Sequence, residues 1–436
     1  MAILATSSIV TEVSAQEMKT SYFLTDKNIY AFQINPASRP DERTATYFGV
    51  ALGCFDLNVK SNIGLSDLFF MDGGRPISGL NSDITADQFL SGLANPLRAS
   101  LGSNMSLLSF GARAEEAFFS MGLNLKTSTD VSVPKELAEI LKKGGDANVY
   151  SLGRFDANTC EYAELSFNYS WKPIECLAIG IGLKGIAGIA RVDAAIDKAI
   201  VNMNNSPIDI RADGTAALYC PYLKVETGGD DTPDGTTINP DHLSPAGYGA
   251  AIDLGAKWAT PLHGLSVDLA FLDIGAIAWK ASTVITAKSD GQYTIDELST
   301  DVIGLRSLTA DKNIMTLALP FKANLGAKYV MPFYDRMSAG LLCSYYNRKA
   351  SRFEARIGVD VCPVDQIDLA LSLGRNSFGN LFGAIVNFRV SGVNLFAGID
   401  GVSIKVNPQF IPVKSINTTL RAGMNIVFEN NVKSTE

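Results

Sequence analysis

The chain has 436 residues, and its 37 lysines and arginines against 45 aspartates and glutamates give a net charge of −8 at pH 7. This acidic balance argues against nucleic acid as a partner. Charged residues make up only 19% of the chain, below the usual share of about 25%. The longest apolar stretch, residues 176–190, contains Lys184 and is too short for a membrane-spanning helix of about 20 residues.

The first residues have the pattern of a secretory signal. A short apolar region is followed by Val13-Ser14-Ala15, which resembles a small-residue cleavage site before Gln16. No basic residue precedes the apolar region. Residues 1–15 are therefore either a truncated signal peptide, which we favour, or a weak mimic of one.

Strict alternation of apolar and polar residues dominates the rest of the chain. Between residues 163 and 171, Leu165 and Phe167 share one parity, whereas Glu164 and Ser166 share the other. A helix of period 3.6 could not separate these residues, so the pattern predicts β-strands. It recurs near residues 46–60, 98–113, 116–130, 160–171, 175–190, 247–259, 264–280, 318–331, 337–348, 352–362, 366–376, 381–391, 393–402 and 415–428.

These stretches predict an all-β protein, a transmembrane antiparallel barrel of about 14 strands. Many of them reach the roughly 9–11 residues that a tilted strand needs to cross a bilayer. Short turns near 172–174, 260–264, 332–335 and 363–365 alternate with long excursions at 61–97, 131–159, 191–246 and 281–317. Outer-membrane barrels have short periplasmic turns and longer extracellular loops, which sets the expected orientation.

Aromatic side chains at the predicted strand ends, among them Trp258 and Trp279, fit a membrane-interface belt. The two histidines, His242 and His263, fall in connections at opposite ends of the predicted barrel. Neither can pair with a nucleophile in the lumen, so we predict that the chain is not an enzyme. We also expect no metal site and no cofactor, because so few of the commonest ligands are present.

Short helices are predicted in the extracellular loops. Thr85 followed by Gln88 forms a capping-box pattern, and Pro134 begins a second helix over residues 135–143. Apolar side chains in the first of these loops either form a capture site for a hydrophobic molecule or pack over the mouth of the barrel. The candidates are Phe69, Phe70, Phe89 and Leu90.

Charged residues share the parity that faces the predicted lumen. They either form a polar path and clamp an inner segment, or simply pair with one another, because an unpaired buried charge is costly. The set comprises Glu164, Lys184, Asp253, Lys257, Lys322, Arg352, Glu354, Arg356 and Asp360.

Asn35-Pro36-Ala37, ahead of the first predicted strand, is similar to the start of the long-chain fatty-acid transporter (FadL) superfamily. Further stretches resemble an uncharacterised branch of FadL/PorV-like outer-membrane proteins. They are residues 61–67, residues 272–275 with Trp279, and Leu319-Pro320 followed by Gly326 and Tyr329. The resemblance implies a barrel of about fourteen strands whose N-terminal segment folds inside as a hatch.

The N-terminal segment also carries apolar side chains, including Tyr22 and Phe23, without strand alternation. Burial inside the barrel would remove them from water at about 25 cal/mol per Å². We therefore expect a signal peptide at 1–15, a hatch or plug at 16–45, the barrel at 46–428 and a periplasmic tail at 429–436.

The predicted function is binding and passive transport of small hydrophobic, fatty-acid-like molecules by an integral protein of a Gram-negative outer membrane. Its partners would be outer-membrane lipid and a hydrophobic small molecule or lipid ligand. The alternative implied by the resemblance is a PorV-like role in secretion or assembly, with a secretion-system or surface protein as partner.

Overall fold

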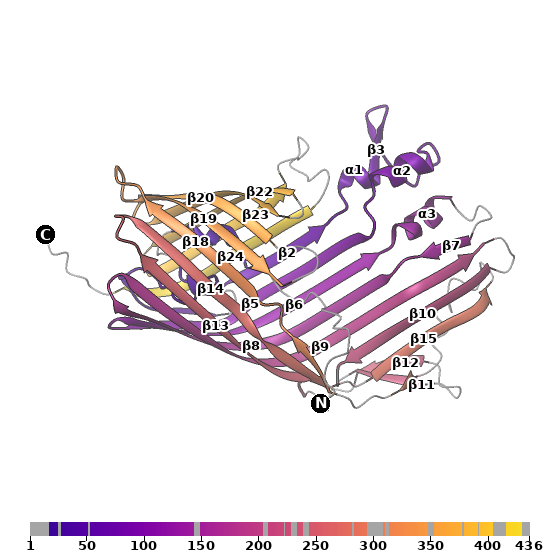
Figure 1. Cartoon of the computed structure of the whole chain (residues 1–436), viewed down its shortest axis with the longest axis horizontal. Coiled ribbons are helices and arrows are strands. Elements are labelled where there is room, and N and C mark those ends of the chain that lie inside the picture. Colours follow the sequence, from indigo (N-terminus) through magenta and orange to yellow (C-terminus); the bar gives the residue numbers. More distant parts are fainter. Residues whose placement is uncertain are drawn as a thin grey trace.

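A closed antiparallel β-barrel makes up most of the protein in the computed structural model (Figure 1). The predicted signal peptide, Arg352 and most of the predicted C-terminal tail lie outside the described residues. The structure describes residues 17–24, 28–50, 53–143, 149–203, 208–221, 223–227, 233–238, 244–280, 283–293, 308–309, 314–347, 353–376, 379–390, 392–403 and 416–429.

Fourteen strand positions form the described barrel wall, and the last position pairs with the first, so the predicted antiparallel barrel of about fourteen strands is confirmed. Most positions are single strands: β5 (Leu97–Ala114), β6 (Ala117–Val133), β9 (Leu177–Asn202), β19 (Met337–Tyr346), β20 (Phe353–Val364), β21 (Ile367–Asn376), β22 (Gly379–Val390), β23 (Val393–Ser403) and β24 (Ile416–Glu429). Each of the others is formed by two strands that pair with a common neighbouring position. They are β1 (Thr44–Val50) with β2 (Phe55–Ser61), β7 (Val149–Leu152) with β8 (Phe155–Ile174), β10 (Ile208–Tyr219) with β13 (Gly247–Ala259), β14 (Leu265–Lys280) with β15 (Thr283–Tyr293), and β17 (Ile314–Ala318) with β18 (Lys322–Val330).

The two faces of the wall differ as the alternation predicts. On β8, Leu165 and Phe167 are exposed on the outer face, whereas Glu164 is buried in the lumen. On β20, Ile357 is exposed and Arg356 is buried. A period of two therefore sorts apolar residues to the outside and polar residues to the inside over most of the wall.

We expect Val359→Arg to lower the free energy of unfolding by about 2–4 kcal/mol, the cost of an arginine on the lipid face near the bilayer midplane. Val359 is 41% exposed on the outer face of β20. Val364→Arg is the matched control, because Val364 is 45% exposed at the end of the same strand. Urea titrations in lipid vesicles measure both variants. Equal costs would mean that the outer face does not contact lipid at Val359.

Five of the short connections lie at one end of the barrel, drawn at the left of Figure 1. We call it the short-turn end; it comprises residues 115–116, 175–176, 260–264, 331–336 and 365–366. The first strand position, predicted as one strand over 46–60, is interrupted between Val50 and Phe55.

The strands on one side of the barrel are longer than the sequence predicts. β9 has 26 residues and β8 has 20, whereas β18 to β23 have between 9 and 12. The predicted excursions at 131–159, 191–246 and 281–317 are therefore partly wrong, since they contain β7, the end of β9, β10 and β15. Beyond residue 190 charged and apolar residues no longer alternate regularly along β9, so the pattern that marks a strand is lost there.

A β-bulge at Asp273 changes which side chains of β14 face the lumen: beyond the bulge, odd-numbered residues point inward in place of even-numbered ones. Leu254 pairs with Phe271, but Ile252 pairs with Ile274, so two residues of β14 oppose Asp253 alone. Asp273 has a φ of 60°, a left-handed conformation that marks the irregularity. Trp279 therefore lies in the lumen, only 1% exposed, and its predicted place in an interface belt is wrong.

A small cap stands at the opposite end from the short turns. Its elements are α1 (Leu65–Leu68), the hairpin β3 (Phe69–Asp72) and β4 (Arg75–Ser78), α2 (Ala86–Gly92) and α3 (Lys135–Lys143). Thr85 and Gln88 form a reciprocal capping box at the start of α2. No helix in the described ranges is long and apolar enough to cross a membrane. The remaining strands are the hairpin β11 (Leu223–Thr227) with β12 (Pro233–Ile238), and β16 (Leu308–Thr309), which pairs with β15.

The predicted capture residues divide into two groups within this cap. Phe89 is buried against Leu93 and Ala138, and Phe70 and Leu90 pack on the same cluster. These three side chains therefore hold the cap together. Phe69 is exposed beside them on β3, and its role in capturing a ligand stays a prediction.

Candidate functional site in the barrel lumen

The described part of the N-terminal segment, residues 17–24 and 28–43, contacts the inner face of the wall. It contains two 3-10 helices, η1 (Lys19–Tyr22) and η2 (Ala31–Gln33). Tyr22 and Phe23 pack against Leu342, Ala370 and Ile385 of the wall. The apolar side chains that the sequence left without a strand pattern are thus buried by strands from the second half of the chain.

Hydrogen bonds attach η1 to the wall. Oδ2 of Asp400 accepts from the backbone N–H groups of Lys19 (2.8 Å) and Thr20 (3.1 Å). The Tyr22 hydroxyl donates to Asp268 at 2.6 Å. Lys328 Nζ donates to the carbonyl of Leu24 at 2.7 Å. Side chains of the wall therefore satisfy these backbone and hydroxyl groups of the short segment.

Tyr30 connects the segment to both ends of the sheet. Its hydroxyl lies 2.8 Å from Ser109 Oγ of β5 and donates to Asn425 Oδ1 of β24, also at 2.8 Å. The ring is buried against Tyr47 and Phe396, with centroids 6.1 and 5.8 Å away.

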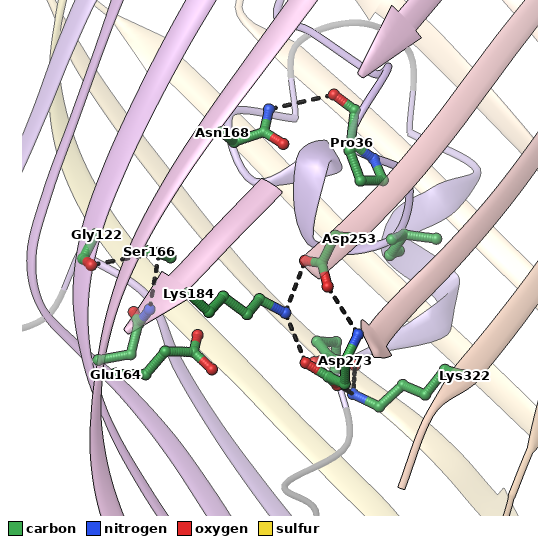
Figure 2. A network of polar contacts seen from close by, with 12 residues as sticks. Pro36, Gly122, Glu164, Ser166, Asn168, Lys184, Asp253, Asp273 and Lys322 are labelled. Atoms are coloured by element: carbon green, nitrogen blue, oxygen red, sulfur yellow. Dashed lines mark hydrogen bonds and ion pairs between the residues drawn. The ribbon is translucent and has the colours of Figure 1, made fainter. Parts of the chain in front are cut away.

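Asn35-Pro36-Ala37, the element that resembles the FadL start, rests on β8 and β13. Asn35 Nδ2 donates to the carbonyl of Ala256 at 3.0 Å. Asn168 Nδ2 donates to the Pro36 carbonyl at 3.2 Å, drawn in Figure 2, and Ser170 Oγ donates to the Ala37 carbonyl at 2.9 Å. Side chains of the wall thus hold two successive carbonyls of the segment.

Glycines on the inner face make room for this segment. A Cβ added at Gly180 would lie 2.1 Å from the Pro36 carbonyl carbon, and one at Gly358 would lie 2.5 Å from the Phe23 ring. The same holds for four further glycines, each against a residue of the segment: Gly255, Gly326, Gly383 and Gly398. The parity of these glycines can be read from the sequence, but the close approach of the N-terminal segment to each of them cannot.

Predicted lumen charges form a continuous ion network (Figure 2). Lys184 Nζ lies 2.7 Å from Asp253 and 2.6 Å from Asp273, and Lys322 Nζ lies 3.0 Å from Asp273. Lys322 also binds Glu17 of the N-terminal segment at 2.9 Å. The sequence singled out Lys184, Asp253 and Lys322 but missed Asp273 and Glu17. Asp273 lies on the wrong parity for a regular strand, and only the bulge turns it inward.

Other predicted charges pair separately within the wall. Glu164 binds Lys126 of β6 at 2.8 Å. Arg356 binds Glu354 at 2.5 Å and also pairs with Asp400, the residue that caps η1. Asp360 contacts Ser338, and Lys257 lines a cavity at the short-turn end.

An apolar layer lies beyond the network, toward the taller part of the wall. Trp279 is buried with Tyr162, Ile186, Tyr219 and Ile277, all pointing inward from β8, β9, β10 and β14. Gly188 leaves the space that the Trp279 ring fills. The sequence did not predict this layer. Tyr219 lies in a stretch predicted as a loop, and the other residues lie in predicted strands whose inward-facing positions looked polar.

Within the described ranges, no cluster of His, Cys, Asp and Glu side chains could hold a metal ion. The lumen is instead filled by a buried peptide segment, a network of paired charges and an apolar layer. This arrangement can bind, exclude or admit a solute, depending on whether the segment stays in place.

Several solved barrel structures are similar to this one. A FadL homologue from Pseudomonas aeruginosa has 13% identity and a TM-score of 0.47, covering 96% of this chain and 100% of its own. The toluene transporter TodX from Pseudomonas putida has 9% identity and a TM-score of 0.45, with the same coverage of both chains. The toluene transporter TbuX from Ralstonia pickettii has 10% identity and a TM-score of 0.44, covering 91% of this chain and 93% of its own.

No curated protein sequence matches the chain. A family model described as a family of unknown function, DUF5723, matches residues 36–400. The matched range begins at Pro36, the second residue of Asn35-Pro36-Ala37, and includes nearly all of the barrel. The match covers well over half of the 436 residues, and the chain therefore belongs to the DUF5723 family.

Proposed function

We propose that this protein is an integral outer-membrane barrel that binds small hydrophobic, fatty-acid-like molecules and lets them pass. The apolar outer face of the wall supports a place in a lipid bilayer, with the short-turn end toward the periplasm. In this proposal the N-terminal segment is a plug, and the predicted lumen charges hold it in place. The contacts of the described residues give no support to the alternative role as a protein-binding partner in secretion.

The apolar layer around Trp279 carries this proposal. A water-filled pore has a polar interior, whereas this lumen places a tryptophan, two tyrosines and several aliphatic side chains on its inner face. An apolar molecule that leaves water gains free energy on such a surface, at about 25 cal/mol per Å² buried. The layer lies on the side of the network away from the plug's Asn35-Pro36-Ala37, where an incoming molecule would arrive first.

Trp279 can report this binding directly. The chain has three tryptophans, and Trp171 and Trp258 are exposed on the outer face. In a variant with both outer tryptophans changed to phenylalanine, a bromine-substituted fatty acid should quench Trp279 fluorescence with saturation. The measurement uses the full-length barrel in lipid vesicles.

The complementary variant, Trp279→Phe, is the matched control. It keeps only the two outer tryptophans, whose quenching should follow the partition of the acid into lipid and should not saturate. If Trp279 is not quenched, or if its quenching follows that of the outer tryptophans, the lumen does not bind the probe and the proposed function is wrong.

A further inference from the structure

Two cavities lie in the lumen on the side of β8, β9 and β13. The inner cavity has a volume of about 30 Å³, and its lining includes Lys126, Glu164, Lys184 and Asp253. This volume is enough to hold water. The outer cavity, at the short-turn end, has a volume of about 220 Å³.

On three neighbouring strands, successive inward-facing residues line the inner cavity, contact the plug and line the outer cavity, in that order. On β9, Gly182 lines the inner cavity, Gly180 contacts Pro36, and Ala178 lines the outer cavity. Since inward residues follow each other at every second position, these three lie in line along the lumen. The inner cavity, the plug and the outer cavity are therefore consecutive along one side of the wall.

The two flanking strands repeat this order. On β13, Asp253 lines the inner cavity, Gly255 would clash with Asn35 if it carried a Cβ, and Lys257 lines the outer cavity. On β8, Asn168 lines the inner cavity, and Ser170 binds the Ala37 carbonyl. Asn35-Pro36-Ala37 is thus the only described part of the plug that touches all three strands at the level between the cavities.

The chemistry of both linings is polar. The inner cavity is surrounded by charged and amide side chains, and the outer cavity has charged side chains on both the plug and the wall, including Arg39, Asp41, Arg113 and Glu175. Such a lining suits water and small ions and is unfavourable for an apolar molecule. This side of the lumen therefore differs in kind from the apolar layer around Trp279.

We propose that the two cavities are halves of one pathway for water and small inorganic ions, with Asn35-Pro36-Ala37 as its gate. The gate is closed by the hydrogen bonds from Asn168 and Ser170 to the carbonyls of Pro36 and Ala37. It opens when this tripeptide moves away from β8 and β9, while the rest of the plug stays attached to the opposite side of the wall. The pathway is independent of the proposed binding of hydrophobic molecules.

Single-channel recordings of the full-length protein in planar bilayers, in potassium chloride, test this gate. The double variant Asn168→Ala, Ser170→Ala removes both hydrogen bonds from β8 to the gate and leaves Asn35 bound to the Ala256 carbonyl of β13. Two such bonds are expected to shift the ratio of closed to open channels by about ten-fold toward the open form. Ser170→Ala alone keeps one bond and should give an intermediate increase.

The double variant Asn324→Ala, Ser344→Ala is the matched control. Asn324 donates to the Ile34 carbonyl at 2.8 Å and is itself bound by Ser344, so this pair holds the residue just before the gate through β18 and β19 and not through β8 or β9. Its conductance should stay close to that of the unmodified protein. An equal increase in both double variants would mean that the plug loosens as a whole, and the proposed gate would be wrong.

Cys176 provides a second readout, because it is exposed and lines the outer cavity. A cationic methanethiosulfonate added on the short-turn side should reduce the conductance of the Asn168→Ala, Ser170→Ala variant. Adding Cys176→Ser should abolish this effect. A folded double variant that conducts no more than the unmodified protein, or whose current ignores the reagent, would overturn the pathway. Trp279 quenching, measured separately, would still decide the proposed function.

Discussion

Changing Asp273 to alanine should lower the free energy of unfolding by about 3 kcal/mol. The Asp273 carboxylate lies between two buried ammonium groups, 2.6 Å from Lys184 and 3.0 Å from Lys322. Removing one partner of a buried ion pair costs about 3–5 kcal/mol. The expected value is at the lower end, because Lys184 keeps Asp253 and Lys322 keeps Glu17.

Urea titrations in lipid vesicles measure this loss, with Asp365→Ala as the control. Asp365 pairs with Arg336 at 2.9 Å, but its side chain is half exposed at the short-turn end. Surface ion pairs of this kind contribute about 0–1 kcal/mol. If the two aspartate variants lose the same stability, the network around Asp273 does not stabilise the fold.

Deleting residues 17–34 while keeping 35–43 should leave a folded barrel with a much larger conductance. The deletion empties the space against Gly326, Gly358, Gly383 and Gly398. The wall tolerates the loss, since its charges also pair with each other, as Arg356 does with Glu354 and Arg421 with Asp56 (2.8 Å). Single-channel recording in planar bilayers measures the change.

A shortened β3–β4 hairpin is the control for this deletion. Removing residues 72–75 also shortens the chain, but the hairpin stands in the cap and contributes no residue to the lumen contacts described above. The variant without residues 72–75 should have the same conductance as the full-length protein. A folded barrel without residues 17–34 that conducts no better than this control would show that the segment does not plug the lumen.

Much of the wall could be predicted from the sequence, because lipid and lumen impose opposite demands on alternate residues. Leu165 and Glu164 illustrate this separation, since each lies on the face that its parity predicts. The parity also predicted that Lys184, Asp253 and Lys322 point inward, although not which partner each would bind. Partners lie on other strands, and the register between strands cannot be obtained from one strand's alternation.

The features that escaped prediction depend on local breaks in that alternation or on its absence. The single extra residue at Asp273 moved this carboxylate and Trp279 to the inside, and no residue type in the sequence marks a bulge there. The end of β9 carries charged and apolar residues without regular alternation, so its sequence predicts a loop. The fit between Gly180 and Pro36 requires knowledge of two segments that are distant in the chain.

The contacts of Tyr30 bear on how the barrel assembles. Its hydroxyl bonds to β5, near the start of the sheet, and to β24, the last strand, across the seam where β24 meets β1. The acceptor on β24 reaches its place only when the sheet closes, so the N-terminal segment cannot complete its docking on an open sheet. The Tyr30 hydroxyl therefore has both of its partners only in the closed ring, so the closed ring is a condition for docking of the segment, whereas the ring can close without the segment.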